Sequence, residues 1–563
     1  MGAHGNLGRM PSQIDELSRV ITEAIARAIT SGQIEASLPE AIPLERPKNR
    51  DHGDYATSIA LQLAKAAGKN PREVALILQK HIGTTPLISA VDIAGPGFLN
   101  FTLNRASQAN LVNSIIESGA KYGQGNSLSG VRINLEFISA NPTGPLHLGH
   151  TRWAAVGDAL GRVLSAAGAD VSREFYINDR GNQMDLFGAS LEAAALGKPI
   201  PEDGYQGNYI HDLALEVVGA NNGIKDLPEP ARLVEFRERG YQLQLNQQKK
   251  VLDTFGTHFD TWFSERSLHD AGSVEHGIDV LRKQGHVFEL DNATWLRTTD
   301  FGDDKDRVLT KSDGSLTYFS SDTAYYINKR ERGFDICIYM LGADHHGYVG
   351  RLKAIAACAG DNPEYNIHVL IGQLVKIMEG GEEVKLSKRA GTIITLEELV
   401  EKVGVDAARY TLIRYPVETP MVMDLDILTR NTNENPVYYV QYAHARIAGV
   451  LRNCEELKIS MSSKDFDPAL LTHDRENELI ATLADFPRIV EGAAELREPH
   501  RIARYLEELA GVYHGFYSDC RVLPLGDEAI APIHTARALL CMATKQVVKN
   551  GLALLGVGAP ERM

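Results

Sequence analysis

One strand–loop–helix segment between residues 131 and 168 constrains the fold of this chain more than any other feature. Residues 131–138, VRINLEFI, are rich in β-branched and apolar side chains and favour a strand. The turn-forming residues 139–145, SANPTGP, follow. Residues 151–168, TRWAAVGDALGRVLSAAG, then favour a helix that ends at a glycine. A strand, a glycine-containing loop and a helix in this order open a parallel α/β sheet.

Later apolar runs extend this pattern. Residues 334–341, FDICIYML, and residues 366–375, NIHVLIGQLV, are bounded by loops and predict further parallel strands. Residues 186–300 are more polar and irregular, which indicates an insertion into the sheet. From about residue 431 onward, helical periods dominate. The sequence therefore predicts an α/β chain with a parallel sheet and a C-terminal all-α helical bundle.

The N-terminal region has the pattern of a small α/β module. Residues 12–30 and 71–80 place apolar side chains at helical spacing. Residues 91–103, VDIAGPGFLNFTL, alternate and are broken by Gly95 and Gly97, which predicts one strand with a bend. A linker at 121–130 follows. We therefore expect three domains, at residues 1–122, 123–430 and 431–563.

Length and composition limit the number of domains, the cellular compartment and the classes of partner. The length of 563 residues is enough for three or four domains. The five cysteines form no CxxC pair, so we expect reduced thiols, no structural zinc and a cytoplasmic protein. No stretch reaches the roughly 18 uninterrupted apolar residues of a membrane helix, so no membrane partner is expected. The formal net charge of −15, taken alone, argues against a nucleic-acid partner.

Two histidines, His147 and His150, stand in the sequence PLHLGH just before the predicted helix. A helix N-terminus favours anions, and imidazole N–H groups can donate to a phosphate as negative charge builds up. Gly149 leaves room for a flat base. The pattern indicates a triphosphate site, although the chain has no GxxxxGK[ST] loop. The alternatives are an incidental pair or two zinc ligands at HxxH spacing.

A second cluster, residues 385–392, KLSKRAGT, places three cations and a hydroxyl within five residues. Such a loop can close over a pyrophosphate and neutralise the charge that develops when the α-phosphorus is attacked. The alternative interpretation is a solvated run of charge.

Together, in this order, the two clusters resemble the HIGH and KMSKS motifs of class I aminoacyl-tRNA synthetases, here written HLGH and KLSKR. Longer segments resemble arginyl-tRNA synthetases across nearly the whole chain, most weakly at 186–300. These segments are LEFISANPTGPLHLGHTR at 135–152, LTYFSSDTAYYINK at 316–329, GADHHGY at 342–348, NPVYYVQYAHARI at 435–447 and the terminal GLALLGVGAPERM.

The resemblance implies an arginine–tRNA ligase, which activates arginine with ATP and transfers it to the terminal ribose of its tRNA. It implies an N-terminal α/β module that touches the tRNA elbow, a class I catalytic domain with a Rossmann-type parallel sheet, and a helical anticodon-binding domain. It further implies that activation needs bound tRNA. Mg²⁺ is expected with the ATP, no metal site in the protein is expected, and the chain is expected to be a monomer. The catalytic residues implied are His147, His150, Lys385, Ser387, Lys388 and Arg389, and ATP would contact His147, Gly149, His150, Lys385 and Lys388.

A pocket for arginine must offer acceptors, because a guanidinium has five donors and no acceptor. By resemblance, Tyr318, Asp322 and Glu265 would read the guanidinium. The α-amino and α-carboxylate groups would be held by Glu136, Ser139, Asn141, His150 and His345. Independently of the resemblance, Tyr318 could be an ordinary core residue, Asp322 could be an N-cap, and His345 with His346 could join the other histidines in a metal cluster.

Candidate tRNA contacts lie at both ends of the chain. Phe98 and Asn100 offer a stacking face and an amide for an unpaired base, although Phe98 could equally be buried core. Residues 431–563 hold 14 Lys and Arg against 18 Asp and Glu, so RNA binding there would need a confined basic surface. Candidates for anticodon bases are Tyr438, Tyr442 and Arg446, with Tyr439 and His444 in the same amphipathic stretch.

Three other functions remain open from the residues alone. A small-molecule nucleotidyltransferase shares an HxGH loop but would not need the terminal domains. A metallohydrolase could be built on the histidines. A tRNA-binding paralogue without activity would not need intact HLGH and KLSKR motifs.

Overall fold

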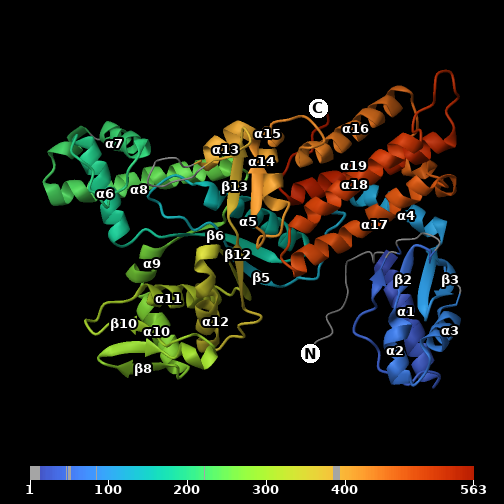
Figure 1. Cartoon of the computed structure of the whole chain (residues 1–563), viewed down its shortest axis with the longest axis horizontal. Coiled ribbons are helices and arrows are strands. Elements are labelled where there is room, and N and C mark those ends of the chain that lie inside the picture. Colours follow the sequence, from blue (N-terminus) through green and yellow to red (C-terminus); the bar gives the residue numbers. More distant parts are fainter. Residues whose placement is uncertain (1–12, 46, 48–51, 84, 221, 385–393) are drawn as a thin grey trace.

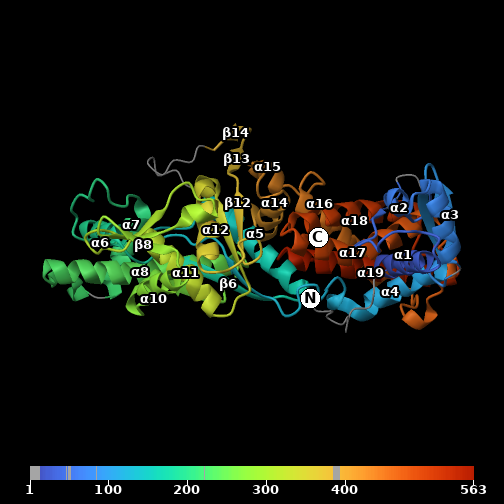
Figure 2. The same ribbon diagram turned by 90° about the horizontal axis from the view of Figure 1, so that it is seen from below.

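The structure is a computed structural model that describes residues 13–563 except 46, 48–51, 84, 221 and 385–393. The molecule is elongated, with the helices α6, α7 and α8 at one end and the N-terminal module at the other (Figures 1 and 2). A parallel sheet lies between them, and a bundle of long helices joins the sheet to the N-terminal module. In the described part of the chain, no helix is both long and apolar enough to cross a membrane.

The central sheet has five strands in the order β12-β11-β5-β6-β7, and every neighbouring pair is parallel. The three strands predicted at 131–138, 334–341 and 366–375 are confirmed as β5, β11 and β12. Four of the five residues of β5 and the first five of β11 are buried, as expected for strands covered by helices on both faces. The strands are β5 (Arg132–Glu136), β6 (Asp170–Ile177), β7 (Thr261–Ser264), β11 (Ile336–Gly342) and β12 (Ile367–Gly372).

Three helices next to strands of the central sheet in sequence position the site. The helix α5 (Leu148–Ala166) begins directly after the loop that follows β5. It approaches the sheet closely, because a Cβ atom on Gly157 would lie 2.3 Å from the Phe137 ring. The other two are α11 (Tyr318–Glu331) and α12 (Val349–Cys358), which flank β11 in sequence.

The insertion into the sheet lies between β6 and β7, and the prediction that it is irregular is wrong. It consists mainly of α6 (Asn182–Ala195), α7 (Asn208–Ala220) and α8 (Glu229–Thr254). The long helix α8 escapes detection because it is polar around most of its circumference. Its buried residues, such as Phe236, Leu245 and Leu252, occupy one narrow face.

A second subdomain separates β7 from β11. It contains the short helix α9 (Glu265–Asp270), α10 (Ser273–Lys283) and an antiparallel three-stranded sheet. The sheet strands are β8 (Val287–Leu290), β9 (Ala293–Leu296) and β10 (Arg307–Thr310).

The N-terminal module has its own hydrophobic core. The prediction of one bent strand at 91–103 is wrong, because residues on either side of Gly95 and Gly97 form an antiparallel hairpin. These glycines have φ values of +51° and +145°, which other residues rarely adopt. The elements are α1 (Gln13–Thr30), β1 (Leu44–Glu45), β2 (Tyr55–Thr57), α2 (Ile59–Ala67), α3 (Pro71–Ile82), β3 (Ile88–Ala94) and β4 (Phe98–Leu103).

The C-terminal all-α bundle is confirmed. Its core is continuous with that of the central sheet. The bundle helices are α16 (Pro436–Glu456), α17 (Asp474–Glu495), α18 (His500–Asp519) and α19 (Pro532–Leu554), with α4 (Arg105–Ser118) packed beside them. Between sheet and bundle lie β13 (Val375–Glu379), β14 (Glu382–Glu383), α13 (Leu396–Val403), α14 (Val405–Ile413), β15 (Met421–Asp424) and α15 (Leu425–Leu428).

Arg409 on α14 ties these parts together from a fully buried position. Its guanidinium lies 2.5 Å from an Asp158 carboxylate oxygen on α5. It also donates to the carbonyl oxygens of Leu555, just after α19, and Phe255, just after α8.

We expect Arg409→Met to lower the free energy of unfolding by roughly 3–5 kcal/mol, since it leaves buried carbonyls and Asp158 without this partner. Urea unfolding followed by circular dichroism measures this. Arg430→Met is the matched control, because its ion pair with Glu434 is exposed and should contribute at most about 1 kcal/mol. Equal midpoints for the two variants would contradict the assignment.

Candidate active site

A cleft of about 760 Å³ opens at the carboxyl ends of the parallel strands. Its walls come from the loop after β5, the first turns of α5, the end of β11 and the segment after β12. This is the edge where open parallel sheets bind ligands. The lining residues include Ser139, Asn141, His147, Gly149, His150 and His345.

His147 and His150 lie together at the start of α5, with ring centroids 4.0 Å apart. His147 is the N-cap, and its Nδ1 accepts from the Gly149 backbone N–H at 3.2 Å. His150 Nδ1 accepts from the His147 backbone N–H at 3.3 Å. Because Nδ1 accepts in both rings, each neutral imidazole carries its proton on Nε2. The loop thus fixes the tautomer that can donate to a phosphate.

Gly149 has a second reason to be glycine. A Cβ atom there would lie 3.1 Å from the His147 ring, which would disturb the paired imidazoles. The backbone at this position is exposed toward the cleft, as needed for the approach of a flat base.

The segment that follows residues 385–393 runs beside the histidines. The Leu148 N–H donates to the Ile394 carbonyl at 3.1 Å, and the Leu396 N–H donates to the Leu146 carbonyl at 2.9 Å. Lys385, Ser387, Lys388 and Arg389 lie outside the described residues. The chain that leaves their cluster is nevertheless hydrogen-bonded to the HLGH loop on both sides of His147.

Two of the three residues assigned to the guanidinium, Glu265 and Asp322, lie near Tyr176 of β6. Its pKa is raised by burial and by the negative charges of Glu265, Asp322 and Glu136 around it. The Tyr176 backbone N–H donates to Ser139 Oγ on the wall of the cleft, at 3.2 Å. The cluster therefore adjoins the cleft. Tyr176 itself was not predicted, because nothing in its local sequence distinguishes it.

The pKa values of Asp322 and Glu265 are both raised above those of ordinary carboxyl groups. Burial raises the pKa of Glu265 to about 7, helped by the nearby charges of Asp322 and Asp179. Burial likewise raises the pKa of Asp322 to about 6. The Tyr348 hydroxyl donates to Asp322. Glu265 is buried and Asp322 is half-buried. Ionisation of both carboxylates in one cluster is unfavourable until a cation arrives, so the site suits a guanidinium.

The alternatives for α11 are wrong. The helix is capped by Thr317, whose side chain accepts from the Ser320 N–H, so Asp322 is not the N-cap. Tyr318 is 75% exposed and is not a core residue. A Cβ atom on Gly181 would lie 3.5 Å from the Tyr318 hydroxyl, which places this phenol beside the start of α6.

Glu136 is held by Ser139, which the sequence predicts at the site, and by Lys329, which sequence reasoning missed. Lys329 Nζ lies 2.6 Å from Glu136 Oε2, and Ser139 Oγ donates to Oε1 at 3.0 Å. Lys329 is fully buried, and its ammonium also lies 3.8 Å from the centroid of the Tyr339 ring. Ser139 has a φ of +44°, so the chain turns sharply as it leaves the strand. The contact between Lys329 and Glu136 joins residues 193 positions apart, and no local pattern signals it.

The remaining residues expected at the α-amino and α-carboxylate groups stand open to the cleft. Asn141 and His345 are both exposed cleft residues. His345 Nε2 lies 3.6 Å from an Asp344 carboxylate oxygen. Within the described ranges, no three His, Cys, Asp or Glu side chains lie close enough together to hold a metal ion, which gives the proposed histidine metal cluster no support.

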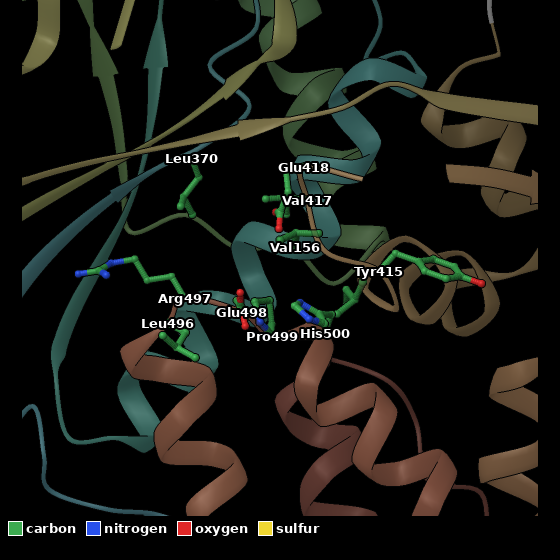
Figure 3. Close-up of a pocket in the computed structure, with 11 residues that line it drawn as sticks. Val156, Leu370, Tyr415, Val417, Glu418, Leu496, Arg497, Glu498, Pro499 and His500 are labelled. Atoms are coloured by element: carbon green, nitrogen blue, oxygen red, sulfur yellow. The ribbon is translucent and has the colours of Figure 1, made fainter. Parts of the chain in front are cut away.

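A second, much smaller cavity of about 70 Å³ lies where α5 meets the helical bundle (Figure 3). Val156 of α5 and Leu370 of β12 face the turn between α17 and α18, which carries Pro499 and His500. The cavity is too small for a nucleotide, and neither His147 nor His150 lines it. The larger cleft is therefore the candidate active site.

Of the candidate RNA contacts near the N-terminus, Phe98 is half-buried and Asn100 is 5% exposed. The alternate residues Leu99, Phe101 and Leu103 of β4 belong to the core of the module. Phe98 therefore lies on the opposite face of β4 and is not core.

In the helical bundle, Tyr438 and Tyr442 stack one turn apart, with ring centroids separated by 5.8 Å. The Arg446 guanidinium lies 4.6 Å from the Tyr442 ring centroid. The same guanidinium lies 5.1 Å from the ring centroid of Tyr517, which is 42% exposed. His444 is fully buried and donates from Nδ1 to the Pro560 carbonyl at 2.8 Å, so it packs the C-terminal segment.

Three family models match successive parts of the chain. They are the arginyl tRNA synthetase N terminal domain at residues 15–103, the tRNA synthetases class I (R) catalytic domain at 111–416 and the DALR anticodon binding domain at 440–563.

Full-length relatives agree. A protein of Frankia alni named arginine–tRNA ligase is 56% identical over 97% of this chain and 99% of its own. Another of that name from Paenarthrobacter aurescens is 53% identical over 98% of this chain and 100% of its own. In fold, the chain resembles the Thermus thermophilus arginyl-tRNA synthetase, with a TM-score of 0.75, 22% identity, and coverage of 97% of this chain and 100% of that one.

Proposed function

This chain belongs to the arginyl-tRNA synthetase family and is an ATP-using class I arginine–tRNA ligase, and on that premise we propose how its cleft performs the reaction. The single observation that carries the proposal is the junction of two features. The imidazole pair that faces the cleft adjoins a cluster of buried carboxylates through Ser139 and Tyr176. One feature suits phosphate and the other suits a guanidinium.

In the first step, the arginine carboxylate oxygen attacks the α-phosphorus of ATP, the bond to the bridging oxygen breaks, and pyrophosphate leaves. His147 and His150 donate from Nε2 to the phosphate as its charge grows. Gly149 admits the adenine. Mg²⁺ enters with ATP as part of the substrate. Pyrophosphate is clamped by the cluster Lys385, Ser387, Lys388 and Arg389.

In the second step, the hydroxyl of the terminal tRNA ribose attacks the arginyl carbonyl and AMP leaves. Side chains form no covalent bond in either step, so rate acceleration comes from positioning and charge stabilisation. Tyr318, Asp322 and Glu265 bind the guanidinium. The α-amino and α-carboxylate groups of the arginine are held by Glu136, Ser139, Asn141, His150 and His345.

Recognition of the tRNA uses both ends of the molecule. The N-terminal module, at about residues 1–122, contacts the elbow through Phe98 and Asn100. The bundle, at 431–563, stacks anticodon bases on Tyr438 and Tyr442 beside Arg446, and the catalytic domain spans 123–430. The protein acts as a cytoplasmic monomer.

Activation of arginine requires bound tRNA. The test is arginine-dependent exchange of labelled pyrophosphate into ATP, with and without tRNA. We expect exchange only when tRNA is present. Equal rates in both reactions would contradict the requirement while leaving the arginine site intact.

The pH dependence follows from the carboxylates. The guanidinium stays protonated at all working pH values, so binding requires Glu265 and Asp322 to be ionised. With pKa values of about 7 and about 6, we expect kcat/KM for arginine to rise with pH up to about 7.5 and then level off. Glu265→Gln should remove the upper inflection and keep the lower one. A flat profile between pH 5.5 and 8 would contradict the pocket.

Lys388→Ala should slow adenylate formation more than it weakens arginine binding, because the ammonium acts on charge that appears only as pyrophosphate leaves. Single-turnover kinetics with saturating arginine, together with the KM for arginine, separate the two effects. If kcat and the KM for arginine of the variant both match the wild type, Lys388 does not bind the pyrophosphate as proposed.

A further inference from the structure

The loop that leads to the imidazole pair is held from outside by side chains of the insertion. Gln248 of α8 donates from Nε2 to the carbonyl oxygens of Asn141 at 3.1 Å and Gly144 at 2.8 Å. Tyr209 of α7 donates from its hydroxyl to the carbonyl of Thr143, which lies between them, at 3.1 Å. Three carbonyls of one short loop therefore depend on two distant side chains.

The orientation of the Gln248 amide and the protonation state of Tyr209 both favour donation to the loop. Gln248 is 2% exposed, and its Oε1 is buried without a hydrogen-bond partner in the described structure. The reversed amide would point an acceptor at two carbonyls, so only the orientation with Nε2 toward the loop is favourable. Burial raises the pKa of Tyr209 well above its usual value, which keeps the phenol protonated as a donor.

The loop has too few backbone donors to satisfy these carbonyl groups itself. Two of its residues, Pro142 and Pro145, have no N–H group, so the segment from Asn141 to Leu146 has few donors of its own. The loop leads straight into His147, the N-cap of α5. A shift in the carbonyls would therefore move the imidazoles relative to the α-phosphorus, and such misplacements are costly in catalysis.

We infer that Tyr209 and Gln248 are positioning residues for the ATP half of the reaction, and that α7 and α8 serve to brace the HLGH loop. The inference rests on the proposed roles of His147 and His150. It assigns a function to the part of the chain where the family resemblance in sequence is weakest.

The test is pyrophosphate exchange in the presence of tRNA, measured for Tyr209→Phe and Gln248→Glu. Tyr209→Phe removes one hydroxyl and should lower kcat about threefold to tenfold, the effect of one net hydrogen bond. Gln248→Glu removes both donations and should lower kcat by about a hundredfold. The KM for arginine should stay within twofold of wild type in both. Tyr205→Phe and Gln247→Glu, on the same helical insertion, are controls expected to retain wild-type rates.

A cycle with His147→Asn distinguishes positioning from general stability. If Tyr209 acts through the imidazole, Tyr209→Phe should change kcat by less than twofold in the His147→Asn background. Multiplicative effects of the two substitutions would overturn the inference, as would wild-type kcat in both single variants, or equal losses in kcat and arginine affinity. Absence of arginine exchange in the wild type would instead refute the proposed function itself.

Discussion

Replacement of Asp322 by alanine should nearly abolish the use of arginine. The carboxylate lies in a cluster with Glu265 around Tyr176, and its raised pKa reflects burial. Loss of one partner of a desolvated charge pair costs about 2–5 kcal/mol, or roughly 30- to 5,000-fold in kcat/KM. The loss should appear in arginine-dependent pyrophosphate exchange, while the KM for ATP stays within a few-fold of wild type.

Two further variants sharpen this result. Asp322→Asn keeps the shape and removes the charge, so it should lose nearly as much activity as alanine. Glu331→Ala, at the far end of the same helix α11, removes a half-exposed carboxylate that pairs with His276, and should leave kcat/KM unchanged. Near-wild-type kcat/KM in Asp322→Ala would refute the pocket assignment.

His147→Asn should lower kcat for adenylate formation about 100- to 1,000-fold, the usual cost of one oriented donor to a developing negative charge. Asparagine is chosen because it is a good N-cap, so α5 should keep its first turn. We expect the KM for arginine to change less than twofold. Rapid-quench measurement of adenylate on the enzyme–tRNA complex gives the rate directly.

The matched control is His211→Ala, since His211 is an exposed histidine on α7 and lines no part of the cleft. It should react at the wild-type rate. A His147→Asn variant with a normal kcat, or one impaired only in its KM for arginine, would refute the assignment of the His147 imidazole to the phosphate site.

Local pattern was sufficient for the parts of the fold that alternate or repeat over short distances. The strand at 131–138 and the helical bundle follow from side-chain periodicity and composition. The loop with His147 and His150 follows from its turn-forming residues. The same reasoning failed at 91–103, because Gly95 and Gly97 are compatible with either a bend or a tight turn. It also failed at α8, whose buried face is too narrow to raise its average hydropathy.

The site could be predicted only where residues act near one another in sequence or resemble a known motif. Lys329, Tyr176 and Gln248 carry no local signal. Each acquires its role from a partner brought close by the fold, such as Lys329 from Glu136 across 193 positions. Buried polar groups of this kind satisfy one another in three dimensions, so their pairing becomes visible only in the structure.

The charge-based expectation of no nucleic-acid partner is wrong, because the chain is a tRNA ligase. A net charge of −15 is an average over the whole chain and does not exclude a confined basic surface. In the proposed binding mode, basic contacts are confined to small patches such as Arg446, which lies against the rings of Tyr442 and Tyr517.

Pyrophosphate exchange with each of the twenty amino acids, in the presence of tRNA, tests the central claim that this cleft selects arginine by its buried carboxylates. We predict exchange with arginine alone, and its loss in Asp322→Asn with no gain for any other amino acid. Exchange of comparable rate with lysine or another amino acid, or undiminished arginine exchange in Asp322→Asn, would contradict the account.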